Sequence, residues 1–424
     1  MTKKKHILFV SYDGMTDSLG QSQVLPYIRE ISKSNFIYTL ISFEKKERFL
    51  KQRENIQMIC NESNIDWHPI SYSGAIPILS TIWNVFRLKN KVFYLHAKNK
   101  FDLFHSRSHV PSLVAQMLQK KHKVPYVFDM RGFWADERVD GGVWNLKNPI
   151  FKKVFDFFKR KELEFIQEAN AIVSLTHNGK QEILSWQKLT KTALTLKTKD
   201  LQIEVIPCCV DTELFNIKNI ETKNKNEIKT KLGITDEKWV IGYVGSIGTW
   251  YMLPEMLDFF KVLKTNKPES IFLFITNESE EKIKSIAIQK GIDTNDIKVA
   301  SCFHKEVPTY ISLFDISIYF ILPAYSKKAS SPTKQGELMA MGIPIVCNAN
   351  VGDADKIISE TESGWVIHEF NENAYKITID KITSSPLPIS ELIIQNGIKE
   401  FNLKVGAEKF RNTYERILQI ENLK

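Results

Sequence analysis

The sequence predicts an α/β protein made of two doubly wound domains, each with a parallel sheet between helices. The 424 residues exceed what one hydrophobic core usually organises, which favours two domains. Short, continuously apolar runs such as His6–Ser11 are typical of strands buried on both faces of a parallel sheet. Segments with helical patterning separate these runs along the chain, and a doubly wound fold requires that order of elements.

Each half of the chain contains six apolar runs that we expect to form strands. In the first half they are His6–Ser11, Ile37–Phe43, Ile65–Ser71, Phe101–Ser106, Tyr126–Met130 and Ala171–Leu175. In the second half they are Trp239–Ser246, Ile271–Thr276, Ile297–Phe303, Ile316–Leu322, Ile345–Asn348 and Trp365–Ile367. A polar run rich in Lys and Asn, residues 216–231, lies between the two sets, and we place the hinge near residues 200–212.

Composition narrows the classes of function. No apolar stretch approaches about 18 residues, so no membrane-spanning helix is expected. The five cysteines are scattered without metal-like spacing and no secretory signal precedes the first strand, which predicts reduced thiols in the cytoplasm. Residues 1–200 carry 32 Lys and Arg against 19 Asp and Glu, whereas residues 201–424 carry 26 against 30. The basic first half predicts an anionic surface or partner, and no pattern of a nucleic-acid module is present.

The most informative stretch is residues 326–344, which carries clear helix signals. These are Ser331 as the N-cap, Pro332 at the first helical position, and Gly342 with Pro344 as the stop, so we expect a helix at Pro332–Met341. A strand that feeds a helix through small hydroxyl residues presents amides and a positive dipole end to a phosphate. Lys334 opposes the dipole unless an anion binds there, and Glu337 suits the hydroxyls of a sugar. The same pattern also fits an ordinary capped helix with both residues as surface charges.

The run Ser331-Pro332-Thr333-Lys334, followed by Glu337-Leu-Met-Ala-Met-Gly-Ile-Pro-Ile-Val346, resembles the donor-nucleotide motif of family 4 retaining glycosyltransferases of the GT-B fold. The resemblance implies two Rossmann-like domains that face each other across a cleft. It also implies that Glu337 holds the nucleotide ribose and that the loop and helix start hold the diphosphate. The donor-binding residues expected on this basis are Gly245, Ser246, Ser330, Ser331, Thr333, Lys334 and Glu337.

Other segments extend the resemblance over nearly the whole chain. Val205–Phe215 is similar to the interdomain segment of the family, which implies domains at residues 1–205 and 206–404. The last helix, predicted at residues 405–424 from its amphipathic spacing, would then pack back on the first domain.

The first domain carries the residues expected at the acceptor. Asp129 and Arg131 lie in a stretch that resembles the Asp-x-Arg-x-x-Trp segment of a bacterial subgroup, which implies that Asp129 is catalytic beside Lys334 and Glu337. A polar loop is expected after the first strand, with a helix from about Gln23. Gly20 and Gln21 of this loop, together with Arg131, would contact phosphate and acceptor. An Asp129–Arg131 structural charge pair is the alternative, and His105 and Arg107, which close another strand, are further candidates.

The sequence departs from the family pattern at two places. The Arg and Lys that clamp the diphosphate in the family are replaced here by Ser246 and the Trp250-Tyr251 pair, and the first acidic residue of the motif is Ala329. Positive charge on the leaving diphosphate stabilises the transition state, so these departures matter. Lys334, with Lys327 or Lys328, or Arg131 from the other domain, could supply it. Asp353-Ala354-Asp355 is a literal D-x-D, but its position just before a helix favours a helix-start role.

Two basic amphipathic segments, Ile76–Leu95 and Ile150–Leu163, are candidates for contact with an anionic membrane surface. Each also fits a helix with a core-facing stripe and a solvated basic face.

These observations predict a hexosyltransferase-type glycosyltransferase that uses a UDP- or GDP-sugar and retains the configuration of the transferred sugar. The resemblance implies a lipid-linked glycan acceptor at the inner face of a bacterial membrane, for capsule, O-antigen or protein glycosylation. No metal or other cofactor is expected. A non-catalytic partner subunit of the same fold and a UDP-sugar 2-epimerase remain as alternatives.

Overall fold

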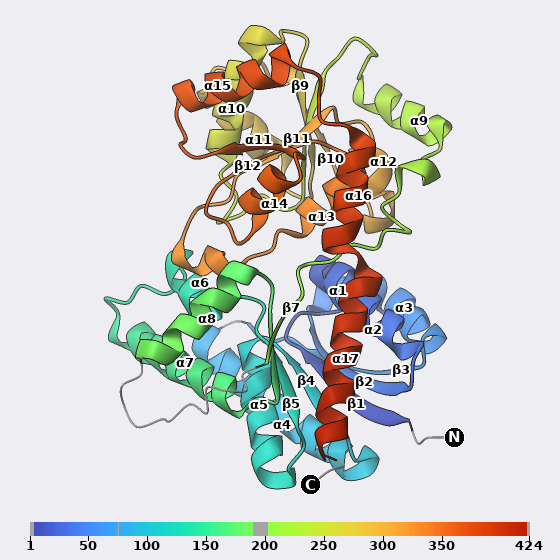
Figure 1. Ribbon diagram of the computed structural model, residues 1–424, viewed down its shortest axis with the longest axis vertical. Coiled ribbons are helices and arrows are strands. Elements are labelled where there is room, and N and C mark those ends of the chain that lie inside the picture. Colours follow the sequence, from blue (N-terminus) through green and yellow to red (C-terminus); the bar gives the residue numbers. More distant parts are fainter. Residues whose placement is uncertain (1–3, 75, 190–201, 422–424) are drawn as a thin grey trace. The chain divides into compact units, whose positions relative to one another are not determined.

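The computed structural model describes residues 4–74, 76–189 and 202–421, and the chain divides into two compact units. Unit 1 comprises Met1–Pro207 and Leu403–Lys424, and unit 2 comprises Cys208–Asn402. The α/β prediction is confirmed, because each unit contains a parallel sheet with helices packed against it (Figure 1).

The sheet of unit 1 has seven strands in the order β3-β2-β1-β4-β5-β6-β7. All of its strand pairs are parallel. The strands are β1 (Lys5–Ser11), β2 (Phe36–Glu44), β3 (Ile65–Ser71), β4 (Leu103–Arg107), β5 (Tyr126–Asp129), β6 (Ala171–Ser174) and β7 (Ile203–Val205). The register sets Ser11 beside Arg107 and Arg107 beside Asp129, so these residues share the carboxyl edge of the sheet.

Nine helices of unit 1 lie in the described residues: α1 (Ser18–Gln23), α2 (Leu25–Ser32), α3 (Lys46–Glu62), α4 (Pro77–Asn99), α5 (His109–His122), α6 (Trp134–Asp140), α7 (Pro149–Glu168), α8 (His177–Leu189) and α17 (Leu403–Glu421). The last of them, α17, packs beside α2 (Figure 1). Phe410 of α17 lies edge-on to Tyr27 of α2, with ring centroids 5.5 Å apart. The amphipathic helix predicted for the end of the chain is therefore confirmed as a helix.

The sheet of unit 2 has six parallel strands in the order β10-β9-β8-β11-β12-β13. They are β8 (Val240–Val244), β9 (Ile271–Ile275), β10 (Ile297–Ala300), β11 (Ile316–Tyr319), β12 (Ile345–Asn348) and β13 (Gly364–Ile367). The helices are α9 (Thr222–Leu232), α10 (Leu253–Asn266), α11 (Glu280–Gln289), α12 (Val307–Ile311), α13 (Thr333–Ala340), α14 (Ala354–Glu360), α15 (Glu372–Ser384) and α16 (Ser390–Phe401). Short 3₁₀ turns connect them: η1 (Ile217–Asn219), η2 (Thr294–Asp296), η3 (His304–Glu306) and η4 (Tyr325–Ala329).

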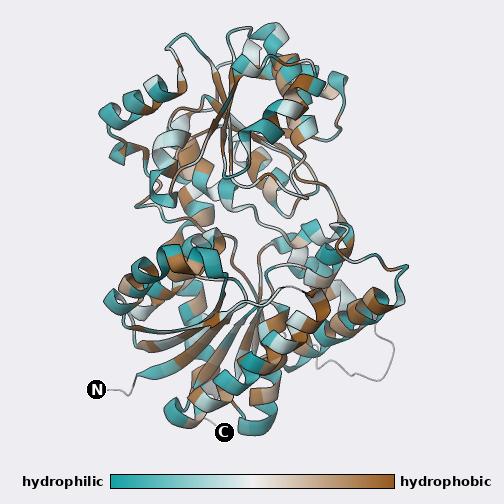
Figure 2. Cartoon of the chain, turned by 180° about the vertical axis from the view of Figure 1, so that it is seen from behind, coloured by the Kyte–Doolittle hydropathy of each residue, from teal (hydrophilic) through white to brown (hydrophobic). Residues whose placement is uncertain are grey.

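Hydrophobic residues concentrate along the strands in the interior of each unit, and polar residues cover the outer faces of the helices (Figure 2). In unit 2 one continuous core joins the strands to α10, with Phe259, Phe272 and Phe274 fully buried. This agrees with the continuous apolar runs in the sequence, since both faces of a parallel sheet are covered.

Two local predictions in unit 1 were incomplete. The three-residue strand β7 was not predicted, because so short a run carries almost no periodic signal. The polar loop expected after the first strand is also shorter than predicted, since α1 begins at Ser18. Gly20 and Gln21 therefore lie in a helix and not in a loop.

Candidate active site

The segment with the predicted donor motif connects β11 to α13 through η4. The helix begins one residue later than predicted: Pro332 is the N-cap and Thr333 is the first helical residue. Ser331 does not cap the helix, because its hydroxyl accepts a hydrogen bond from the amide of Cys208 at 3.1 Å. The prediction of Ser331 as the N-cap was wrong because this hydroxyl has a partner 123 residues away.

Lys334, in the first turn of α13, is buried among aromatic rings. Lys334 is only 6% exposed, so the alternative interpretation of Lys334 as a surface charge is wrong. The Nζ atom donates a hydrogen bond to the Tyr243 hydroxyl at 2.9 Å. The same atom lies 4.0 Å from the ring centroid of Tyr243, 3.7 Å from that of Tyr251 and 6.0 Å from that of Tyr319. We call these three rings the tyrosine cage.

The tyrosine cage offers Lys334 a neutral environment. Among the described residues, 4–74, 76–189 and 202–421, no carboxylate forms an ion pair with its ammonium group. Burial lowers the pKa of Lys334 well below its ordinary value, and the charge of Glu337 acts in the opposite direction. Burial also raises the pKa of Tyr243, so its hydroxyl stays protonated and bonds onward to the Ser246 carbonyl at 2.6 Å.

Gly245 provides the space that the Lys334 ammonium occupies. Its φ of +113° is a conformation that residues with a side chain rarely adopt. A Cβ atom built on Gly245 would lie 3.2 Å from Lys334 Nζ. The structure therefore places Gly245 next to Lys334, while the neighbouring Ser246 side chain is exposed. The donor contacts predicted for Gly245 and Ser246 stay predictions.

Glu337 lies one turn after Lys334 and is 8% exposed, so it is not a surface charge either. Its Oε1 atom lies 3.7 Å from Nε2 of His304 in η3. That nitrogen is buried and has no hydrogen-bond partner among the described residues. The separation exceeds a direct hydrogen bond, so a ligand hydroxyl that bonds to both groups would satisfy them.

The remaining predicted donor residues surround the start of α13. Ser330 and Thr333 are partly exposed, and the Ser330 amide closes η4 by donating a hydrogen bond to the Lys327 carbonyl at 3.1 Å.

The two lysines of η4 differ in their surroundings. Lys327 is buried, with Nζ 3.6 Å from the ring centroid of Trp250, whereas Lys328 is exposed and lies over Tyr325. Both lysines were considered as substitutes for the diphosphate clamp of the family. Of the two, Lys327 packs against Trp250, which stands in the clamp position. Ala329 is buried and supplies no carboxylate.

In unit 1, Asp129 lies at the end of β5 and is 2% exposed. Its carboxylate is 3.8 Å from Arg131, 3.9 Å from Arg107 and 3.4 Å from Nε2 of His105. Burial alone would raise the pKa of Asp129, but Arg131, His105 and Arg107 together bring it below the ordinary value. The alternative of a charge pair between Asp129 and Arg131 is therefore present, and it extends to Arg107. The catalytic role predicted for Asp129 stays a prediction.

The Asp129 cluster connects to the last helix of the same unit. The Nδ1 atom of His105 lies 2.7 Å from the Tyr414 hydroxyl of α17, and the imidazole stacks on Phe9 with ring centroids 4.1 Å apart. Burial lowers the pKa of His105, which favours a neutral ring. Arg131 adopts a φ of +58°, which is uncommon for a residue with a side chain.

Gly20 and Gln21 occupy α1, beside the loop that follows β1. A Cβ atom on Gly20 would lie 2.1 Å from the Gly14 carbonyl oxygen, so close packing inside unit 1 already requires glycine there. Gln21 donates a hydrogen bond to the side chain of Gln52 at 2.6 Å. The loop itself is held by the buried carboxylate of Glu44, which accepts a bond from the Met15 amide at 2.7 Å. The phosphate and acceptor contacts predicted for Gly20 and Gln21 stay predictions.

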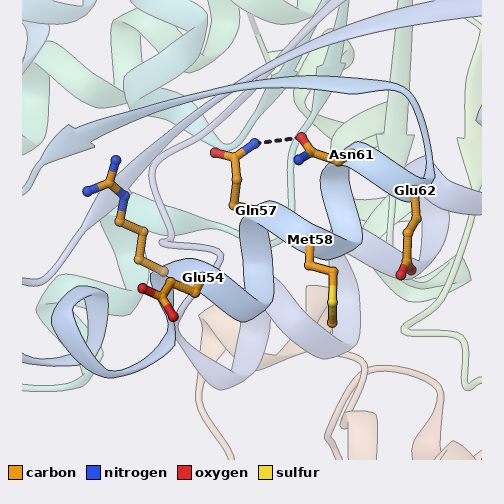
Figure 3. Close-up of a pocket in the computed structure, with 6 residues that line it drawn as sticks. Glu54, Gln57, Met58, Asn61 and Glu62 are labelled. Atoms are coloured by element: carbon orange, nitrogen blue, oxygen red, sulfur yellow. Dashed lines mark hydrogen bonds between the residues drawn. The ribbon is translucent and has the colours of Figure 1, made fainter.

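Two further features lie apart from these groups. A hollow on α3 is lined by Arg53, Glu54, Gln57, Met58, Asn61 and Glu62, and includes none of the predicted site residues (Figure 3). Asp353 of the D-x-D sequence is the N-cap residue of α14, and Asp355 accepts a hydrogen bond from the Asn350 amide at 3.0 Å. Asp353 and Asp355 therefore stand at a helix start, as the sequence predicted.

Sequence reasoning missed the tyrosine cage and His304. Tyr243 and Tyr319 lie within predicted strands and were not singled out, and Tyr251 was noted only as a departure from the family. The available signal was position, because β8 and β11 are neighbours and their carboxyl ends meet. His304 follows β10 in the same way, since side chains after parallel strands gather at one edge.

Comparison with known proteins gives a family match over part of the chain and a fold for the whole chain. The family model for glycosyl transferases group 1 matches residues 224–400. This range lies within unit 2 and includes the tyrosine cage and Glu337. No curated protein sequence matches this chain. The family match supports an enzyme that transfers a glycosyl group.

The solved structures show the fold. A glycosyltransferase from Rickettsia africae is 16% identical, with 98% of this chain and 99% of that chain covered and a TM-score of 0.69. HepE from Anabaena, in complex with UDP and glucose, is 12% identical, with 96% and 99% covered and a TM-score of 0.67. A UDP-GlcNAc 2-epimerase from Neisseria meningitidis, bound to UDP-GlcNAc, is 12% identical, with 97% and 99% covered and a TM-score of 0.57. The predicted GT-B type of fold, with two Rossmann-like domains, is confirmed.

Proposed function

We propose that this protein transfers a hexose from a UDP- or GDP-sugar to a glycan acceptor, with retention of configuration. Unit 2 binds the donor: Lys334 and the first amides of α13 hold the diphosphate, and Glu337 with His304 holds the ribose. Unit 1 receives the acceptor, for which we propose a lipid-linked glycan. The family match within unit 2 and the nucleotide-bound proteins of the same fold support this assignment.

The observation that carries the proposal is the buried ammonium of Lys334. It lies at a helix start that favours anions, and its hydrogen-bond partner is a neutral phenol. A buried cation without a paired carboxylate is costly, and a diphosphate would supply the missing negative charge. The charge that gathers on the diphosphate during transfer would be stabilised by the same contact, which lowers the barrier.

The proposed reaction proceeds on one face of the sugar. The bond between the anomeric carbon and the diphosphate oxygen breaks, and the acceptor oxygen bonds to the same carbon. The acceptor proton passes to the departing diphosphate oxygen. The protein contributes position and charge, which suits a site without a covalent nucleophile placed by its motif.

Thermal-shift measurements with UDP-, GDP-, ADP- and CMP-sugars test the donor site, because a ligand that binds only the folded state raises its melting temperature. We expect a shift with one nucleotide, its loss in Lys334→Met and a smaller shift in Glu337→Gln. Lys356→Met and Glu360→Gln are matched controls, since both residues lie on the short helix α14 of the same unit with exposed side chains. If the protein binds none of these nucleotides, the proposal is wrong.

The two alternatives give different products. A non-catalytic subunit, which the buried Ala329 favours, would bind the nucleotide sugar but neither transfer nor hydrolyse it. A 2-epimerase would convert UDP-N-acetylglucosamine without any acceptor. Product analysis by NMR with and without a glycan acceptor separates both alternatives from transfer.

A further inference from the structure

Helix α4 of unit 1 carries an apolar stripe on its outer face. Leu79, Ile82, Trp83 and Phe86 are 62%, 61%, 52% and 50% exposed. Their spacing of three and four residues places them on one side of the helix. The rings of Trp83 and Phe86 stack with centroids 5.7 Å apart. We call these four residues the α4 stripe.

The fold of unit 1 does not account for the α4 stripe. The opposite side of α4 already supplies the core contacts, because Leu88, Val92 and Leu95 are buried. The exposed stripe therefore lies in the first half of the helix, and the buried apolar residues lie in the second half on the opposite side. Single exposed apolar residues are ordinary, but a contiguous exposed stripe marks an interaction surface.

The charged residues of α4 and its C-cap all carry the same sign. Residues 76–100 contain Arg87, Lys89, Lys91, Lys98 and Lys100 and no Asp or Glu. Within the described residues none of these five cations forms an ion pair, as the salt bridges of unit 1 involve other side chains. Helix α5 packs beside α4 (Figure 1) and ends in Lys120, Lys121 and His122. Lys121 lies over the ring of Phe93 of α4, at 5.4 Å.

Helix α7, the other basic amphipathic segment, differs in both respects. Phe158, Phe165 and Ile166 are buried, so its apolar side faces the core. Three of its four lysines pair with carboxylates of the same unit: Lys152 with Asp156, Lys159 with Glu162, and Lys161 with Glu164. Of the two segments expected to suit a membrane surface, α4 is therefore the better candidate.

We propose that the α4 stripe and its flanking cations bind the surface of a bilayer that contains anionic phospholipids. Leu79, Ile82, Trp83 and Phe86 enter the interface between headgroups and acyl chains, while the lysines of α4 and α5 contact the headgroup phosphates. Tryptophan suits that interface because its ring is apolar and its N–H is polar. No helix in the described residues is long and apolar enough to cross a membrane, so α4 lies on the surface. This binding does not depend on the donor site of unit 2.

The test is flotation of the full chain with vesicles of phosphatidylcholine, with and without phosphatidylglycerol. We expect binding to the anionic vesicles at low salt, weakened by added salt. The double variant Trp83→Ser/Phe86→Ser should bind at least about tenfold more weakly, and so should Lys89→Glu/Lys98→Glu. The control is Leu50→Ser/Met58→Ser, which removes two exposed apolar side chains of α3 outside the stripe. It should bind as the wild type does.

Three results would overturn the proposal. The first is wild-type protein that does not float with anionic vesicles. The second is equal binding by the wild type and Trp83→Ser/Phe86→Ser. The third is a dimer, measured by light scattering, that this variant abolishes while vesicle binding is absent, since the stripe would then join two copies. The nucleotide-induced thermal shift should be unchanged in the stripe variants, so failure here and failure of the donor site are distinguishable.

Discussion

Both units bury an ionisable side chain at the carboxyl edge of a parallel sheet, but they treat its charge differently. Asp129 in unit 1 is surrounded by Arg107, Arg131 and His105, all within 4 Å. Lys334 in unit 2 is surrounded by tyrosine rings and donates its hydrogen bond to a phenol. The first charge is compensated within its own unit, whereas the second lacks an opposite charge in contact with it.

The comparison gives a physical criterion for separating structural charges from binding charges. A buried ion that is paired inside the fold stabilises its neighbours, and removal of one partner leaves the others buried and unpaired. A buried ion without a partner makes the empty protein less stable, and only a bound counter-ion offsets that cost. By this criterion Asp129 has the environment of a structural residue, although the sequence predicted a catalytic role. Lys334 has the environment of a residue that binds a ligand.

The largest expected effect is on stability in unit 1. Asp129→Ala should lower the free energy of unfolding by about 3–5 kcal/mol, because Arg107 and Arg131 lose the buried carboxylate that lies between them, and the more exposed Asp13 stays near Arg107 only. Urea unfolding followed by circular dichroism measures this change. Asp156→Ala is the control, since Asp156 forms an exposed pair with Lys152 and should change stability by less than about 1 kcal/mol.

The matching change in unit 2 should have the opposite sign. Lys334→Met removes a buried charge and leaves no charged partner behind, so stability should stay unchanged or rise while nucleotide binding is lost. If Asp129→Ala proves neutral and Lys334→Met strongly destabilises the empty protein, the distinction between the two sites fails.

A smaller effect is expected at Gly245, which separates the backbone of the donor loop from Lys334. Gly245→Ala places a methyl group 3.2 Å from the ammonium and forces alanine into a φ of +113°. We expect a loss of about 1–3 kcal/mol, seen as weaker nucleotide binding in calorimetry and a lower melting temperature. Gly248→Ala in the same loop is the control, because a Cβ atom there meets nothing within 4 Å. Equal effects of both substitutions would remove Gly245 from the site.

The sequence was sufficient for the sheets and for the donor helix. Buried parallel strands are continuous apolar runs, so His6–Ser11 and Ile345–Asn348 could be identified without any partner. The helix after β11 was found from Pro332 and Gly342, although the start was placed one residue early. The prediction of Ser331 as the N-cap failed. A hydrogen bond from the distant Cys208 amide occupies the Ser331 hydroxyl, and such tertiary contacts cannot be inferred from neighbouring residues in the sequence.

The sequence did not predict which side chains surround each buried charge. The tyrosine cage draws Tyr243, Tyr251 and Tyr319 from separate segments, and only the folded sheet brings them to Lys334. The bond from His105 to Tyr414 joins residues 309 positions apart. Periodicity and motifs report the nearest residues along the chain, so they identified the charged groups but not whether those charges are compensated.

The pH dependence of stability separates the two charges by the pH range in which each one acts. Because burial lowers the pKa of Lys334, the unfolded chain binds more protons between that lowered pKa and about 10.5, so the Lys334 contribution to stability rises with pH in this window. The pKa of Asp129 is also lowered, but for a carboxylate this contributes stability that is present above about 3.9 and is lost as pH falls through the lowered value.

Nucleotide binding should follow the protonation of Lys334. A diphosphate favours the ammonium form, so the empty protein takes up a proton on binding whenever the pH lies above the lowered pKa. The affinity should then fall by up to about tenfold for each unit of rising pH. Calorimetry in two buffers of different ionisation enthalpy measures the proton directly. Lys334→Arg should bind without this uptake, because a guanidinium stays charged throughout the range. If the wild type also binds without a proton, Lys334 is already charged in the empty cage, and the rings alone compensate it.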